Sequence, residues 1–66
     1  MTEQDTLLLR KWIHDLNNRV GTILATAELL QMEELSSKAS DRSKVIELKA
    51  LELREIIRQI SDRYAT

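Results

Sequence analysis

The sequence contains no cysteine, no proline and no phenylalanine, and it has a single glycine. Without cysteine the chain can form neither a disulfide nor a thiolate metal site, so apolar packing must hold the fold together. Without proline, and with Gly21 as its one glycine, the chain has little that would interrupt a regular helix. At 66 residues we expect one domain, spanning residues 1–66.

A strong charge of one sign and a long apolar run are also missing. Ten Lys and Arg residues face eleven Asp and Glu residues, which gives a formal net charge of -1. With no basic block, one Trp and one Tyr, the chain lacks the features that bind nucleic acid. No apolar run approaches the roughly 20 residues that cross a bilayer, and the N-terminus lacks a signal-peptide pattern. These absences predict a cytoplasmic protein without a membrane segment.

What is present is an apolar pattern with the period of a helix. In the first half of the chain, alternating steps of four and three residues place one set of side chains on one side of a helix: Leu9, Ile13, Leu16, Val20, Ile23, Ala27 and Leu30. The second half repeats this spacing with another set: Ile46, Ala50, Leu53, Ile57, Ile60 and Tyr64. The pattern predicts two amphipathic helices.

Between the two patterns, residues 36–41 lose the period and are rich in serine. Such side chains compete for backbone hydrogen bonds, which favours a turn. We therefore expect helices at about 3–35 and 40–64, joined by a turn at about 36–40. The candidates for the cap of the second helix are Ser37, Ser40 and Asp41. The result is an all-α fold, an antiparallel helical hairpin.

Both helices carry more apolar side chains than one hairpin can cover. Outside the main stripes stand Leu29, Met32, Leu35, Val45, Leu48 and Leu51 near the turn, and Trp12, Leu24 and Ile56 elsewhere. A helix of a four-helix bundle touches two neighbours and needs such a broad stripe. We therefore expect two hairpins to pair as a homodimeric four-helix bundle. The alternative is that the leucines near the turn only cover the end of the hairpin.

The strongest indication of chemistry is the segment that begins at His14, the only histidine. A nucleophilic imidazole must be partly neutral near neutral pH, reachable by its donor, and close to a group that holds or takes its proton. Asp15 adjoins His14, and Asn18 lies one helical turn further along the same outward face. Residues that would let a partner approach this face are Lys11, Gly21, Thr22 and Ala25.

Other interpretations of this segment remain open. A lone exposed histidine beside an aspartate also occurs in helices without a chemical role. A metal site is not expected, because no second His or Cys stands at helical spacing from His14. The alternating Glu and Arg residues of the second helix are expected to form a solvated face with ion pairs one turn apart.

The run His-Asp-Leu-Asn-Asn-Arg-Val-Gly-Thr-Ile-Leu-Ala-Thr-Ala-Glu-Leu-Leu, from His14 to Leu30, resembles a known motif. It is similar to the phosphoacceptor box in the dimerisation and histidine-phosphotransfer domain of two-component sensor histidine kinases and related phosphotransferases. The second helix shares only its heptad pattern and length. The resemblance implies a homodimeric four-helix bundle with the phosphorylated histidine on the outer face of the first helix.

The resemblance also assigns roles to individual residues. It maps the phosphoacceptor onto His14 and the acidic residue that assists proton removal onto Asp15. Asn18 matches the polar position that, in some members, helps position water for dephosphorylating the receiver. Many members carry a proline where this chain has Arg19, so we expect a straight helix without the family's kink.

The resemblance further implies partners. Because the 66 residues contain no Gly-rich nucleotide-binding segment, we expect the chain not to be an autonomous kinase and to bind no cofactor itself. A response-regulator receiver domain, and a separate or tethered ATP-binding kinase domain, would supply the phosphoryl group as aspartyl phosphate or ATP, together with Mg²⁺. Lys11 or Arg10 would offset the phosphate charge.

Three functions are therefore consistent with the sequence. The favoured one is a phosphoacceptor and dimerisation domain that takes a phosphoryl group on His14 and passes it to a receiver aspartate. The second is a dimerisation or partner-binding module that is derived from this family and is not phosphorylated. The third is a plain structural hairpin.

Overall fold

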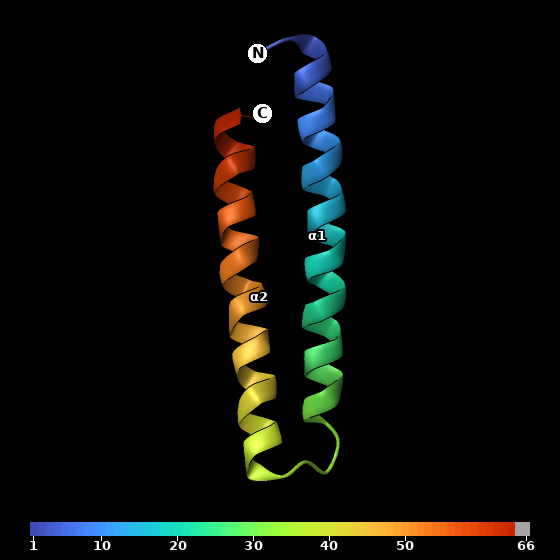
Figure 1. Ribbon diagram of the computed structural model, residues 1–66, viewed down its shortest axis with the longest axis vertical. Helices are drawn as coiled ribbons and strands as arrows, with labels where there is room; N and C mark the ends of the chain where they lie inside the picture. Colours follow the sequence, from blue (N-terminus) through green and yellow to red (C-terminus); the bar gives the residue numbers. More distant parts are fainter. Residues whose placement is uncertain (65–66) are drawn as a thin grey trace.

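The computed structural model describes residues 1–64, which form two helices of nearly equal length. Helix α1 spans Glu3–Gln31 and helix α2 spans Ser37–Tyr64. The helices lie side by side and antiparallel, so the start of α1 and the end of α2 lie opposite to the connection (Figure 1). The hairpin is 50 Å long. The prediction of an all-α antiparallel hairpin is confirmed over these residues.

Helix α1 begins with a capping box. The Thr2 hydroxyl accepts a hydrogen bond from the backbone N–H of Asp5 at 3.0 Å, and the Thr2 N–H donates to the Asp5 carboxylate at 3.2 Å. Glu3 and Asp5 place negative charge in the first turn, where the helix dipole favours it. A cap of this kind contributes about 1 kcal/mol. This cap explains why α1 begins at Glu3, the position predicted from the sequence.

The connection between the helices lies earlier in the chain than predicted. Helix α1 ends at Gln31 instead of near residue 35, so Met32 and Leu35 belong to the connection. The next residues include Glu33 and Glu34, whose negative charge is unfavourable at a helix C-terminus. The last turn of α1 also contains no basic residue that would offset the dipole.

Helix α2 also begins earlier than predicted, at Ser37 instead of near residue 40. Ser36 caps this helix, because its hydroxyl accepts a hydrogen bond from the backbone N–H of Ala39 at 3.2 Å. The three caps that we expected are wrong, since all of them lie inside the helix: Ser37, Ser40 and Asp41. The serine-rich segment 36–41 therefore does supply the cap, but the capping residue is Ser36, the first of the segment.

The core is a narrow seam between the two helices. Its side chains recur every seven residues along each helix: Ile13, Val20 and Ala27 on α1, and Ser43, Ala50 and Ile57 on α2. Leu24 joins them, and Leu9 packs against the cluster. Ser43 is fully buried, and its hydroxyl donates a hydrogen bond to the carbonyl oxygen of Ala27 at 3.2 Å. This serine was not predicted to lie in the core.

Half of each predicted apolar stripe stays open, because one neighbouring helix covers only part of it. We call the open half the apolar face: Leu16, Ile23 and Leu30 on α1, and Ile46, Leu53 and Ile60 on α2. Leu16 and Leu53, for example, are 45% and 42% exposed. Ile23, Leu30 and Ile46 line one common hollow, so the open halves of both helices lie on the same side of the hairpin.

Neither helix combines the length and the apolar character needed to span a membrane.

Candidate functional site

His14 lies on the outer surface of α1. It follows the buried Ile13 directly, and its own side chain is exposed. Because successive residues are about 100° apart around a helix, His14 and Leu16 point about 160° apart. The imidazole therefore lies on the side of α1 opposite to the apolar face, where a large partner can reach it.

The Asn18 side chain is within hydrogen-bond distance of the His14 ring. The amide nitrogen Nδ2 of Asn18 lies 3.3 Å from Nε2 of His14. The two residues are four apart on an unbroken helix, which stacks their side chains on one face. The structure confirms that they share this face. It also confirms that α1 continues through Arg19, as the absence of proline predicted.

The Asp15 carboxylate turns away from the ring. Its Oδ2 lies 3.5 Å from Nζ of Lys11, one turn earlier, and its main-chain carbonyl accepts a hydrogen bond from Arg19 at 3.1 Å. Consecutive residues on a helix do not face each other, which separates Asp15 from His14 although they are neighbours in sequence. Asp15 instead lines a hollow with Trp12, Leu16 and Arg19, beside the apolar face.

Of the predicted contact residues, Gly21 and Ala25 lie along the side of α1 that carries His14, whereas Thr22 also lines the hollow of the apolar face with Ile23 and Leu30. Gly21 is half-buried, and a Cβ atom placed on it would meet nothing within 4 Å. Ala25 is exposed one turn further on, and the Thr22 hydroxyl donates a hydrogen bond to the Asn18 carbonyl oxygen at 3.1 Å. These small side chains lie about two to three turns along α1 from His14 and leave room there for a partner to approach the helix. Lys11 lies at its edge, in the ion pair with Asp15.

The charged side chains of α2 form the solvated face that the sequence predicted. Arg58 donates two hydrogen bonds to the carboxylate of Glu55, at 2.6 and 3.0 Å, and a third to Asp62 at 3.2 Å. The hydrogen bond from Arg58 lowers the pKa of Glu55, and the same bond raises the pKa of Arg58.

Within residues 1–64, no group of three or more His, Cys, Asp or Glu side chains could hold a metal ion.

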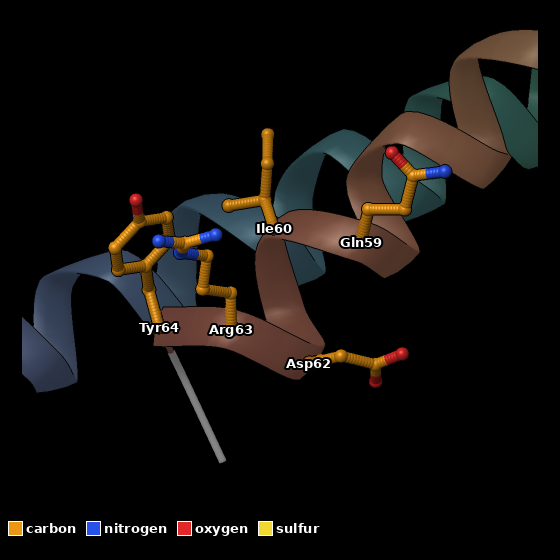
Figure 2. A pocket seen from close by; sticks show the side chains of 5 residues that line it. All are labelled: Gln59, Ile60, Asp62, Arg63 and Tyr64. Carbon is orange, nitrogen blue, oxygen red and sulfur yellow. The ribbon is translucent and has the colours of Figure 1, made fainter.

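A further hollow lies at the C-terminal end of α2 (Figure 2). Its lining residues are Gln59, Ile60, Asp62, Arg63 and Tyr64. The guanidinium carbon of Arg63 lies 5.6 Å from the centre of the Tyr64 ring, a distance at which a cation attracts an aromatic face. All five residues come from one helix, so the hollow is open on its outer side. It extends the apolar face beside Ile60 and contains no histidine.

Comparisons with protein-family models, with curated proteins and with solved structures found no match to this chain.

Proposed function

We propose that this hairpin is the phosphoacceptor and dimerisation domain of a two-component phosphorelay. In this role His14 accepts a phosphoryl group and passes it to an aspartate of a receiver domain. The observation that carries the proposal is that the exposed imidazole and the apolar face lie on opposite sides of α1. A second copy of the hairpin can cover the apolar face while His14 stays open to an incoming protein.

The apolar face supports a homodimeric four-helix bundle. Burying a large apolar side chain completely contributes about 1.5–3 kcal/mol of favourable free energy. Each residue of this face is about half exposed, so its burial in a dimer would contribute roughly half of that amount. A stable interface needs about 800 Å² from each partner, or about a seventh of the 5347 Å² surface of the hairpin. One side of a hairpin 50 Å long can supply this area.

The surroundings of His14 suit phosphoryl transfer, which depends mainly on positioning and on compensation of charge. Arg10 precedes His14 by one helical turn on the same face, and Lys11 lies at the edge of that face. Both cations are therefore close to the position that the phosphoryl group would take. The donor is a receiver aspartyl phosphate, or ATP on a separate or tethered kinase domain, and Mg²⁺ comes with the donor.

The remaining residues take roles around this transfer. Gly21, Thr22 and Ala25 form the surface on which the receiver docks next to His14. Asp15 accepts a ring proton after transfer, which requires its carboxylate to leave Lys11. Asn18 contacts the ring directly and is the polar residue that positions water when the receiver is dephosphorylated.

Labelling with known donors tests the proposal. The chain is incubated with phosphorylated receiver domains and with isolated ATP-bound kinase domains of two-component systems, and acid-labile, base-stable phosphate is measured. The wild type is expected to take up label and His14→Gln to lose it. The control adds Gln59→His to His14→Gln, which restores an exposed histidine on the other helix and should stay unlabelled. Wild-type protein without label from any of these donors would contradict the proposal.

The apolar face also favours a second function, a dimerisation or partner-binding module without phosphorylation. The exposed leucines and isoleucines need a partner whatever the chemistry of His14. This alternative predicts a dimer that takes up no label. A plain structural hairpin predicts neither label nor dimer.

A further inference from the structure

We infer that Asn18 is a positioning residue that holds the neutral His14 ring in one tautomer, with a lone pair on Nε2 and the proton on Nδ1. The tautomer can be measured without any phosphodonor. Its chemical consequence rests on the proposed function, because it sets which ring nitrogen is ready to attack phosphorus.

The contact between the two side chains carries the inference. The Asn18 amide nitrogen, 3.3 Å from His14 Nε2, carries two hydrogens and no lone pair that can accept. In this orientation of the amide the nitrogen faces the ring and can only donate, which makes Nε2 the accepting nitrogen of the contact. In a neutral imidazole one nitrogen accepts and the other carries the hydrogen, which leaves the proton on Nδ1.

The helix fixes the geometry of this pair. His14 and Asn18 occupy successive turns of α1, and the buried Ile13 and Val20 anchor these turns against α2. Asp15, the other polar residue that adjoins His14, is held by Lys11 at 3.5 Å. The tautomer is therefore set by the amide one turn away and not by the carboxylate next in sequence.

The tautomer defines the transfer step. The lone pair of Nε2 forms the bond to phosphorus while the bond from phosphorus to the leaving oxygen breaks, and that electron pair departs on the oxygen. Nδ1 keeps its proton during the attack, and the resulting phosphoimidazolium then releases this proton to water or to a nearby carboxylate. Because Nε2 carries no proton beforehand, no base has to deprotonate the attacking atom. The Asn18 amide has only to rotate away, which an exposed side chain can do readily.

Nuclear magnetic resonance of the ¹⁵N-labelled ring tests the assignment at a pH where the imidazole is neutral. Asn18→Ala should lower the ratio of the Nδ1–H to the Nε2–H tautomer by about twofold, the size expected of an exposed contact between residues four apart. Asn18→Asp should shift the ratio further toward Nε2–H, because a carboxylate can only accept. Asn17→Ala is the matched control, with the same change of side chain on the adjacent exposed position, and should leave the ratio unchanged.

Phosphoramidate, a chemical phosphoryl donor that needs no protein partner, gives the second readout. The rate of phosphorylation at Nε2 should fall in Asn18→Asp in proportion to the population of the Nδ1–H tautomer and stay at the wild-type value in Asn17→Ala. Equal tautomer ratios in wild type, Asn18→Ala and Asn18→Asp would overturn the inference. A shifted ratio in a protein that no receiver or kinase domain labels would leave this inference intact and contradict the proposed function instead.

Discussion

The hydroxyl of Ser43 on α2 donates a hydrogen bond to the carbonyl oxygen of Ala27 on α1 at 3.2 Å, within the seam between the helices. Ser43 is fully buried, and Ala27 is 2% exposed. Two small side chains at this level let the helices approach closely near the connection. The hydrogen bond also joins one position on each helix, so it favours a single register of α2 against α1.

Ser43→Ala is expected to lower the free energy of unfolding by about 0.5–1.5 kcal/mol, the net contribution of a typical hydrogen bond. Ser43→Leu should cost more, about 1–3 kcal/mol, because a fully buried site has no room for a larger side chain. Urea unfolding at a fixed protein concentration measures both. Ser61→Ala, at a half-buried serine near the other end of α2, is the control and should change stability by less than about 0.5 kcal/mol. An equal loss in Ser43→Ala and Ser61→Ala would contradict this role of Ser43.

The period of the apolar residues was sufficient to predict both helices, because that period reports which side of a helix is covered, and the short connection between them predicted their antiparallel pairing. It could not reveal Ser43, since a serine carries no apolar signal. The available signal was its register, because Ser43 stands seven residues before Ala50 and so continues the buried heptad. The end of α1 was also missed, although Glu33 and Glu34 indicate it through their charge.

For the candidate site, the spacing within one helix was more informative than adjacency in sequence. His14 and Asn18, four residues apart, meet as predicted. Asp15 adjoins His14 in the chain, yet its carboxylate pairs with Lys11 because neighbouring residues point about 100° apart. The partner of a given charge depends on rotamers and competing ions, and the sequence alone does not determine these.

The Glu55–Arg58 pair makes the stability of α2 depend on pH. The Arg58 hydrogen bond holds the pKa of Glu55 below its value in the unfolded chain. The pair therefore stabilises the fold above the unfolded pKa, and this contribution is lost as the pH falls through the folded pKa. Both side chains are exposed, so the effect is small and is further reduced by salt.

Carboxyl titration by nuclear magnetic resonance measures this coupling. Arg58→Gln should raise the pKa of Glu55 toward its ordinary value, and Glu55→Gln should make the loss of stability in acid less steep. A pKa of Glu55 that is the same in wild type and in Arg58→Gln would show that the hydrogen bond is not its cause.

Gly21→Ala should stabilise the hairpin by about 0.5–1 kcal/mol, because alanine is the better helix former and the helix interior needs no glycine here. The added Cβ would meet nothing within 4 Å. Thermal unfolding measures the gain, and the reverse change Ala25→Gly, one turn away on the same side, should lose a similar amount. If a receiver docks closely on this surface, Gly21→Ala should also slow phosphoryl transfer to His14 while the fold becomes more stable. A stabilised variant with unchanged transfer would remove Gly21 from the docking surface.

The apolar face gives the most direct test of the proposed dimer. Ile23→Glu places a charge in the middle of that face, and its desolvation should weaken self-association by at least about tenfold, or 1.4 kcal/mol. Leu53→Glu, on the other helix, should do the same. Leu29→Glu is the matched control, since Leu29 is 64% exposed on α1 but lies outside the apolar face.

Sedimentation equilibrium over a series of concentrations measures the association. Trp12 gives a second signal, because it is 55% exposed in the single hairpin and lines a hollow with Leu16. Its fluorescence should shift to the blue as the wild type associates, and the shift should persist in Leu29→Glu but not in Ile23→Glu. Dimers of equal strength in all of these variants would mean that the apolar face is not the interface. Pairing of two hairpins would then no longer ensure that His14 stays open.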